Sequence, residues 1–195
     1  RLRGLITAAL SSGASVVTGS KALLATHGGQ LLGLAQAKGV DLLFEAAVAG
    51  AIPVVRTVKE GLAGDKIISI SGILNGTTNY ILDEMTTKGL DYDTALAAAQ
   101  QLGYAEADPT ADVEGLDAAA KAAILATLAF GQEVTLADVS VTGISKITKA
   151  DIDQAGARGG VMRLLCTAQA PASQPSAVVE TVFVANDTPL AAIHG

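Results

Sequence analysis

The segment from Leu116 to Phe130, with the sequence LDAAAKAAILATLAF, constrains the fold of this chain more than any other. Apart from Asp117 and Lys121 it contains only Ala, Leu, Ile, Phe and one Thr. A helix with so little polar surface has to be buried on most of its sides, so the chain must build a packed core around it. Because Asp117 and Lys121 are four residues apart, they lie on one face of this helix, one turn apart.

Two interpretations of this acid and amine remain open. In a helix rich in charges, the two residues would form an ordinary ion pair on a solvated face. In a helix this apolar, a lysine needs a partner or a chemical task, because burying an unpaired charge costs free energy. The composition of the segment favours the second interpretation, in which Lys121 transfers protons and Asp117 holds it in place.

The composition of the whole chain indicates a globular protein and excludes several partners. Half of the 195 residues are apolar and 16% are charged, which is enough apolar material for a buried core. The formal net charge of −6 argues against nucleic acid or an anionic membrane as the main partner. The longest uncharged apolar block, residues 122–131, is too short to span a bilayer. A single cysteine, Cys166, excludes an internal disulfide and predicts a cytoplasmic location.

The first fifty residues alternate between strand and helix patterns. Apolar runs at Ser15–Thr18 and Asp41–Val48 predict strands, and the residues between them have helical spacing up to Gly39. This alternation predicts parallel strands joined by a crossover helix. Ligands bind at the carboxyl ends of such strands, so Gly19–Lys21 and Glu45–Gly50 are expected at a ligand-facing edge.

The rest of the chain predicts a sheet covered by helices, so the fold class is α/β with a second, α+β part. Three strands are expected, at Asp65–Ile70, Val161–Ala168 and Val178–Ala185. Helices are expected at Tyr80–Lys88, at Tyr92–Leu102 and in the apolar segment. The stretch PASQPS between the last two strands is expected to be a surface turn.

Two charged residues of the first part are candidates for ligand binding. Lys21 follows a strand, where its amine would meet a phosphate, a carboxylate or a ribose, or would simply be exposed at a helix start. Glu45 is the only charge in the apolar run LLFEAAVAGAIPVV. It is therefore either a protonated or hydrogen-bonded structural residue, or a cation ligand together with carbonyls of Val48–Ile52.

The second part offers a polar turn and an acidic stretch. The turn SGILNGTTN provides backbone N–H groups for an anion, and it is equally good turn and helix-capping chemistry. Five acids follow between Gly103 and Asp117, without the spacing of a calcium loop, so most of them are expected to be solvated. Glu106, directly after GYA, is placed to hold an ammonium group. Cys166 lies in an apolar strand pattern, which predicts a packed thiol.

Five motifs together resemble homoserine dehydrogenase: VVTGSKALLATHG, FEAAVAGAIPVV, SGILNGTTNYIL, GYAEADPTADVEGLDAAAKAAIL and GISKIT. They occur in the order and spacing of that family over nearly the whole chain. The resemblance implies reversible reduction of L-aspartate 4-semialdehyde to L-homoserine with NADPH or NADH, on the route to threonine, methionine and isoleucine.

The resemblance also implies an organisation. Residues 1–50 would be the C-terminal remnant of an NAD(P)-binding Rossmann domain, with a Rossmann-like parallel sheet. Residues 51–195 would be the catalytic and dimerisation domain, an α+β sheet domain covered by helices and truncated at its C-terminus. The protein would be a cytoplasmic homodimer or a larger homo-oligomer.

The resemblance assigns roles to individual residues. Lys121 would be the general acid–base, and Asp117 and Glu106 would bind the amino acid part of the substrate. Glu106 and Gly103 would lie near NADP or NAD, and Lys21 would lie at the nicotinamide end of that cofactor. A sodium site is also implied, with four ligands: the Glu45 carboxylate and the carbonyls of Val48, Gly50 and Ile52.

The chain departs from the family pattern in three respects. It contains no G-x-G-x-x-G fingerprint, it has Gly19-Ser20 where the family has Ala-Asn before the lysine, and it ends before the segment that returns to the nucleotide domain. We therefore expect an internal piece of a longer protein, which binds NAD(P) poorly and is inactive by itself.

Two rival functions remain. A dehydrogenase that oxidises the same semialdehyde to an acyl phosphate needs a thiolate in a polar, electropositive site, and the apolar surroundings of Cys166 do not suit that role. A non-catalytic amino acid-binding or dimerisation module of the same fold would explain the missing glycine fingerprint. Truncation explains the same observation more simply.

Overall fold

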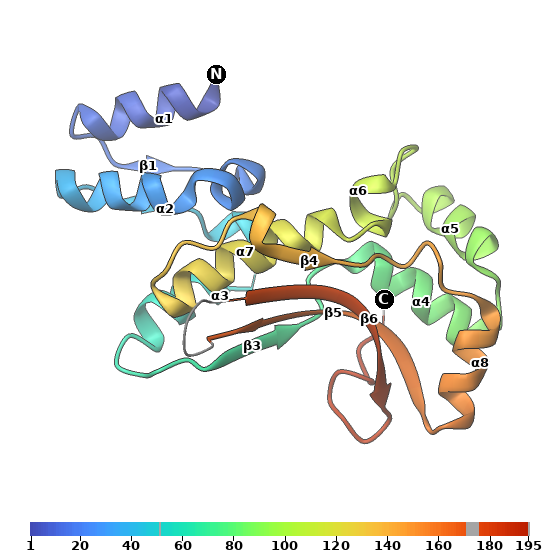
Figure 1. Cartoon of the computed structure of the whole chain (residues 1–195). Coiled ribbons are helices and arrows are strands. Elements are labelled where there is room, and N and C mark those ends of the chain that lie inside the picture. Colours follow the sequence, from blue (N-terminus) through green and yellow to red (C-terminus); the bar gives the residue numbers. More distant parts are fainter. Residues whose placement is uncertain (51, 171–175, 195) are drawn as a thin grey trace. The chain divides into compact units, whose positions relative to one another are not determined.

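The computed structural model describes residues 1–50, 52–170 and 176–194 (Figure 1). Their contacts divide the chain into two compact units. The first comprises Arg1–Ile70, Ala120–Val139 and Ala168–Ala177. The second comprises Ser71–Ala119, Ser140–Thr167 and Val178–Gly195. Each unit therefore combines segments that are distant in the sequence.

The first unit contains the predicted parallel strands and their crossover helix. β1 (Val16–Val17) pairs in parallel with β2 (Leu42–Leu43). The connection is α2 (Lys21–Lys38), which ends at Gly39 in the left-handed conformation, with a φ of 66°. A glycine adopts this conformation without steric cost and so ends the helix, as predicted. The strands are shorter than expected, because the chain enters a 3₁₀ turn, η1 (Glu45–Ala47), soon after β2.

Short helices complete the first unit. α1 (Leu2–Ser11) packs against α2. α3 (Val54–Arg56) contacts η1 and continues into a π-helical turn, η2 (Thr57–Gly61). The 3₁₀ turn η3 (Leu136–Asp138) contacts α2 from a distant part of the sequence.

A four-stranded sheet has the strand order β3–β5–β6–β4. Its strands are β3 (Ser69–Gly72), β4 (Val139–Val141), β5 (Gly160–Gln169) and β6 (Ser176–Ala185). The predicted strands at β5 and β6 are confirmed. The predicted turn PASQPS falls mainly on residues 171–175, outside the described residues.

The strand predicted from Asp65 begins instead at Ser69, so that prediction was wrong for its first residues. The N–H of Ala170, just after β5, donates to the carbonyl of Ile68 at 3.1 Å. Because β5 ends there, residues before Ile68 have no ladder partner on it. A side-chain hydrogen bond of 2.9 Å between Ser71 and Thr167 continues the same antiparallel pairing.

Three helices of the second unit contact a fourth one. α4 (Gly76–Lys88) contacts α5 (Tyr92–Gln101), α6 (Thr110–Val113) and α8 (Lys149–Ala157). The predicted start of α4 at Tyr80 was too late, because the Asn75 side chain accepts a hydrogen bond from the N–H of Thr78 and begins the helix earlier.

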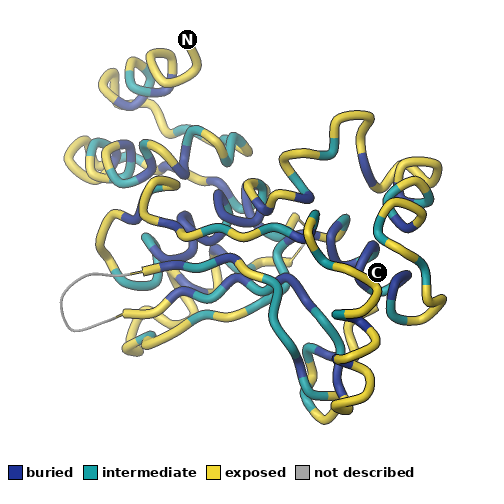
Figure 2. The backbone as a smooth tube through the Cα atoms, turned by 45° about the vertical axis from the view of Figure 1, so that its right-hand side comes forward, coloured by how far each residue is buried: buried dark blue, intermediate teal, exposed yellow. Residues whose placement is uncertain are grey.

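Helix α7 (Leu116–Phe130) is buried along most of its length, as its composition predicts (Figure 2). Residues 118–120 and 122–126 are buried, whereas Asp117 and Lys121 are half-buried. Within the first unit, Ile124 and Leu128 share a small apolar space with Leu24 of α2. No helix among the described residues combines the length and the apolar character needed to cross a membrane.

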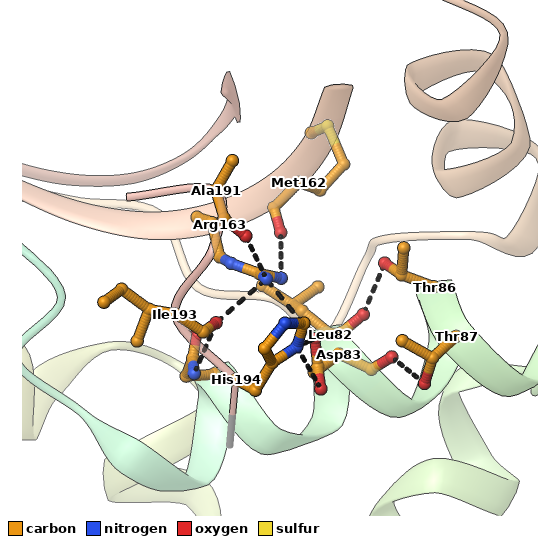
Figure 3. A network of polar contacts seen from close by, with 10 residues as sticks. Leu82, Asp83, Thr86, Thr87, Met162, Arg163, Ala191, Ile193 and His194 are labelled. Carbon is orange, nitrogen blue, oxygen red and sulfur yellow. Dashed lines mark hydrogen bonds and ion pairs between the residues drawn. The ribbon is translucent and has the colours of Figure 1, made fainter. Parts of the chain in front are cut away.

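A buried arginine holds the C-terminal segment of the second unit (Figure 3). The Arg163 side chain is 1% exposed, and its Nη2 donates to the carbonyls of Ala191 and Ile193 at 3.0 Å each. The same nitrogen lies 3.3 Å from Oδ1 of Asp83 on α4, which also contacts the His194 ring at 3.1 Å. Burial lowers the pKa of the Arg163 guanidinium, and the Asp83 charge opposes that effect. The network therefore ties residues of β5, α4 and the C-terminal segment together.

We expect Asp83→Asn to lower the free energy of unfolding by about 3 kcal/mol, because it leaves the buried Arg163 charge without its counter-charge. Urea unfolding of the full-length protein measures the change. Asp153→Asn is the matched control, because it removes an acid from the exposed Lys149–Asp153 pair, whose side chains are 50% and 63% exposed. Equal stabilities of the two variants would contradict the assignment of a structural role to Asp83.

Candidate functional site

The carboxyl ends of β1 and β2 bring two of the predicted segments together. Because the strands pair in parallel, the chain leaves both at the same edge of the sheet. Lys21 is the first residue of α2, and Glu45 is the first residue of η1. A Cβ added at Gly19 would lie 3.9 Å from the Cβ of Ala46, so the two segments are neighbours. The structure thus places Lys21 and Glu45 at the edge where sheets of this type bind ligands.

The Glu45 carboxylate is held by the first turn of α3. Its Oε1 accepts a hydrogen bond from the N–H of Val55, and its Oε2 accepts one from the N–H of Arg56, both at 2.9 Å. These N–H groups lack partners within the helix, so the carboxylate satisfies their hydrogen bonds. Its negative charge is stabilised by the partial positive charge of these N–H groups. The carboxylate is thus hydrogen-bonded, and it keeps further oxygen lone pairs available to a cation, so the two alternatives for Glu45 are compatible.

The backbone after Glu45 makes a tight left-handed turn. Ala49 has a φ of 59° and Gly50 a φ of 56°, and alanine rarely adopts such a conformation. Residue 51 lies outside the described residues. Among the described residues no three His, Cys, Asp or Glu side chains gather as a metal-binding group. A cation here would therefore depend on backbone carbonyls.

Glu45 also lines the wall of a cavity in the first unit. The cavity has a volume of about 480 Å³, and Phe44, Arg56 and Lys59 are among its other lining residues. The Lys59 amine lies 5.8 Å from the centre of the Phe44 ring. Acidic, basic and apolar groups therefore all line this space after β2.

Asn75 joins two carboxylates in the second unit. Its Nδ2 donates to Oδ1 of Asp112 at 2.7 Å and to Oδ2 of Asp117 at 3.1 Å. Its Oδ1 accepts from the N–H of Thr78 at 2.8 Å and from the Thr78 hydroxyl at 3.0 Å. The capping interpretation of the turn SGILNGTTN is thereby confirmed. The side chain is 5% exposed and uses both ends of its amide at once.

The loop after α5 carries Gly103 and Glu106. Gly103 has a φ of 78°, and the Glu106 side chain is exposed. The Glu106 carbonyl accepts from Nε2 of Gln100 at 3.1 Å, and the Tyr104 carbonyl accepts from the Thr77 hydroxyl at 2.7 Å. These hydrogen bonds hold the loop through its backbone carbonyls. The Glu106 side chain is exposed and does not take part in them.

The acids of this loop region differ in their environment. Asp108 is exposed, and hydrogen bonds from the hydroxyl and N–H of Thr110 lower the pKa of its carboxyl group. Glu106 and Glu114 are exposed too, as predicted for most of the five acids. Asp112 and Asp117 are half-buried and share Asn75. Sequence reasoning therefore missed Asp112, and the only available signal was its position five residues before Asp117.

Lys121 lies on α7, four residues after Asp117. Because α7 is one continuous helix, this spacing puts both residues on the same face. The Lys121 side chain is half-buried in a helix whose neighbouring positions are buried. An amine in this position is suited to exchanging a proton with a bound oxygen atom, and the nearby acid is suited to orienting a cationic group.

Cys166 is a packed thiol, as its strand pattern predicts. It is 3% exposed in β5, and its Sγ lies 3.8 Å from the carbonyl of Ala118, to which it donates. A thiol in such apolar surroundings is poorly suited to act as a nucleophile.

Two family models match the chain. The model of homoserine dehydrogenase matches residues 53–195, and the model of the homoserine dehydrogenase NAD-binding domain matches residues 1–45. Homoserine dehydrogenase of Mycobacterium tuberculosis H37Rv is 54% identical over 198 residues, covering 99% of this chain and 45% of that protein. That of Corynebacterium glutamicum is 52% identical over 197 residues, covering 98% and 44%. The chain thus spans less than half the length of these relatives.

Solved structures show the same similarity. A homoserine dehydrogenase from Thiobacillus denitrificans superposes with a TM-score of 0.95 at 41% identity, covering all of this chain and 45% of that one. A hyperthermophilic archaeal homoserine dehydrogenase in complex with NADPH has a TM-score of 0.84 at 28% identity, covering 98% of this chain and 55% of that one.

We expect Glu45→Gln to lower the free energy of unfolding by about 1–2 kcal/mol, because the amide NH₂ faces one of the two N–H groups that the carboxylate accepts. Urea unfolding of the full-length protein measures the loss. Glu60→Gln is the control, because Glu60 forms only an exposed pair with Arg56, with side chains 64% and 73% exposed. Equal stabilities of Glu45→Gln and Glu60→Gln would contradict the assignment of Glu45 as the residue that stabilises the start of α3.

Proposed function

The chain belongs to the homoserine dehydrogenase family, and from this we propose that its protein catalyses the reversible NAD(P)H-dependent reduction of L-aspartate 4-semialdehyde to L-homoserine. The observation that carries the proposal is the arrangement on α7. An otherwise apolar, mostly buried helix bears Asp117 and Lys121 one turn apart, and Asn75 fixes the Asp117 carboxylate. This combination suits a reaction in which an oxygen atom gains a proton while a charged substrate is held in place.

Lys121 acts as the general acid–base in this proposal. In the reducing direction its ammonium group stabilises the negative charge that develops on the aldehyde oxygen and then donates a proton to it. In the oxidising direction the neutral amine takes the proton from the hydroxyl group of homoserine. The nicotinamide cofactor, when bound, supplies or accepts the hydride.

Asp117 and Glu106 hold the amino acid part of the substrate. Their carboxylates pair with the ammonium group of the substrate. Charge-assisted hydrogen bonds of this kind both strengthen binding and orient the bound substrate. Asp117 is already oriented by Asn75, whereas the exposed Glu106 side chain has freedom to close on a ligand.

The cofactor is NADP or NAD, held in part by Lys21, Gly103 and Glu106. Lys21 lies at the carboxyl edge of the β1–β2 pair, where dinucleotides bind in sheets of this type. At Gly103 an added Cβ would meet no atom within 4 Å, which leaves room for a ligand to approach the backbone. The archaeal relative in complex with NADPH supports a nicotinamide cofactor.

A sodium ion is proposed at the turn after η1. Its ligands are the Glu45 carboxylate and the carbonyls of Val48, Gly50 and Ile52. The fit rests on an oxygen-only donor set, on the left-handed turn at Ala49 and Gly50, and on the fixed orientation of Glu45. Hard cations prefer such oxygen ligands.

The proposed organisation places the end of an NAD(P)-binding domain in residues 1–50 and a catalytic and dimerisation domain in residues 51–195. The two family models support this boundary, since one ends at residue 45 and the other begins at residue 53. We propose a cytoplasmic homodimer or larger homo-oligomer that acts on small molecules.

Lys121→Met is expected to lower kcat for homoserine oxidation by about 10²–10⁴-fold, because general acid–base catalysis contributes that much. The assay is homoserine-dependent reduction of NAD⁺ and NADP⁺ by the full-length protein, with circular dichroism to confirm folding. Lys38→Met is the control, since Lys38 is an exposed residue at the end of α2. Turnover that survives in Lys121→Met would remove Lys121 from the mechanism. Absence of turnover in the folded wild type would favour the non-catalytic binding module.

Cys166→Ser is expected to leave kcat and KM within about twofold of wild type, because a buried thiol that contacts a carbonyl takes no part in the chemistry. The same assay measures both constants. Loss of turnover without loss of folding would instead show that the thiol takes part in the reaction.

A further inference from the structure

Asn75 makes more hydrogen bonds than its role as a helix cap requires. Capping of α4 uses Oδ1, which accepts from the N–H of Thr78. The other half of the amide, Nδ2, donates one N–H to Asp112 and the other to Asp117. Both donors and both acceptor directions of the amide are thereby occupied.

The hydrogen bonds determine which way the amide points. If its oxygen and nitrogen were exchanged, the oxygen would face two carboxylates and the NH₂ group would face the N–H of Thr78. Both changes replace attraction by repulsion. The cap therefore orients the amide, and the oriented amide presents its two N–H groups to the carboxylates.

The two carboxylates approach the same nitrogen atom, so like charges lie close to each other there. Asp112 lies in α6 and Asp117 in the first turn of α7, so the repulsion acts between two elements. In a half-buried place the repulsion is only partly screened by water. A neutral donor between them forms a hydrogen bond with each carboxylate and fixes the direction of each.

Aspartate would cap α4 as well as asparagine does. It would, however, place a third carboxylate between Asp112 and Asp117. The choice of residue at position 75 therefore separates the two tasks: capping tolerates either side chain, whereas holding the acids requires the amide NH₂.

We propose that Asn75 is a positioning residue for the reaction, which acts by holding the carboxylates of Asp112 and Asp117 in a fixed arrangement for the substrate ammonium group. The inference rests on the proposed function, since Asp117 is the substrate-binding acid there. Asn75 itself touches the acids and not the substrate, so its effect appears in the binding of the amino acid and not in that of the cofactor.

The test compares Asn75→Asp and Asn75→Ser with wild type in the full-length protein. Both variants retain a capping oxygen, and both lose the pair of N–H donors. We expect KM for homoserine to rise about 10- to 100-fold in each, while KM for the nicotinamide cofactor changes less than about twofold. Steady-state kinetics with each substrate varied in turn, after circular dichroism has confirmed folding, give both constants.

Asp91→Ala is the control for destabilisation of the unit that contains Asn75. Asp91 caps α5 by accepting from the N–H of Thr94 at 2.8 Å, so its removal weakens a neighbouring helix of the same unit. We expect its KM for homoserine to remain within about twofold of wild type. A rise equal to that of the Asn75 variants would show that general weakening of the unit explains the effect and would overturn the inference.

The remaining outcomes also decide the question. Wild-type KM values in a folded Asn75→Asp protein would overturn the inference and leave the proposed function intact. Absence of turnover in wild type would remove the proposed function itself. If Asn75→Asp does not fold, Asn75→Ser decides. If neither folds while Asp91→Ala does, Asn75 is a structural residue and the inference is wrong.

Discussion

The burial of α7 is the constraint on which the rest of the structure depends. Its alanine-rich surface permits close packing, and residues 118–120 and 122–126 are removed from water. Half-buried Asp117 and Lys121 interrupt this apolar surface on one face, and such groups are stable only with partners. The same helix thus contributes to core packing and carries Asp117 and Lys121, the two charged residues that act in the proposed reaction.

Three polar side chains in the two units are each held by hydrogen bonds to the backbone. Glu45 binds two N–H groups of α3, Arg163 binds two carbonyls of the C-terminal segment, and Asn75 binds the N–H of Thr78. Each of these contacts fixes a side chain against a particular part of the backbone. Polar satisfaction therefore orients the candidate site residues before any substrate or cofactor binds, which reduces the cost of ordering them.

Local signals predicted much of the fold. Gly39 ended the crossover helix as expected, the strands at β5 and β6 were found where alternation indicated, and the apolar segment formed α7. The start of α4 was missed because a single side-chain hydrogen bond from Thr78 to Asn75 outweighs the apolar spacing. The strand from Asp65 was placed too early because its extent depends on where β5 ends, and that is a property of the partner strand.

By itself, the sequence determined the α/β class, the parallel pair with its crossover helix, the buried helix with Asp117 and Lys121 on one face, and the family. The first three follow from composition, periodicity and spacing within short segments, which do not depend on distant contacts. The family follows from the resemblance of five motifs, and the family models show it. Only the tertiary structure decided that Asp112 shares Asn75 with Asp117 and that the Glu45 carboxylate braces α3. Such pairings depend on which side chains folding brings within hydrogen-bond distance, and local spacing along the chain does not show which they are.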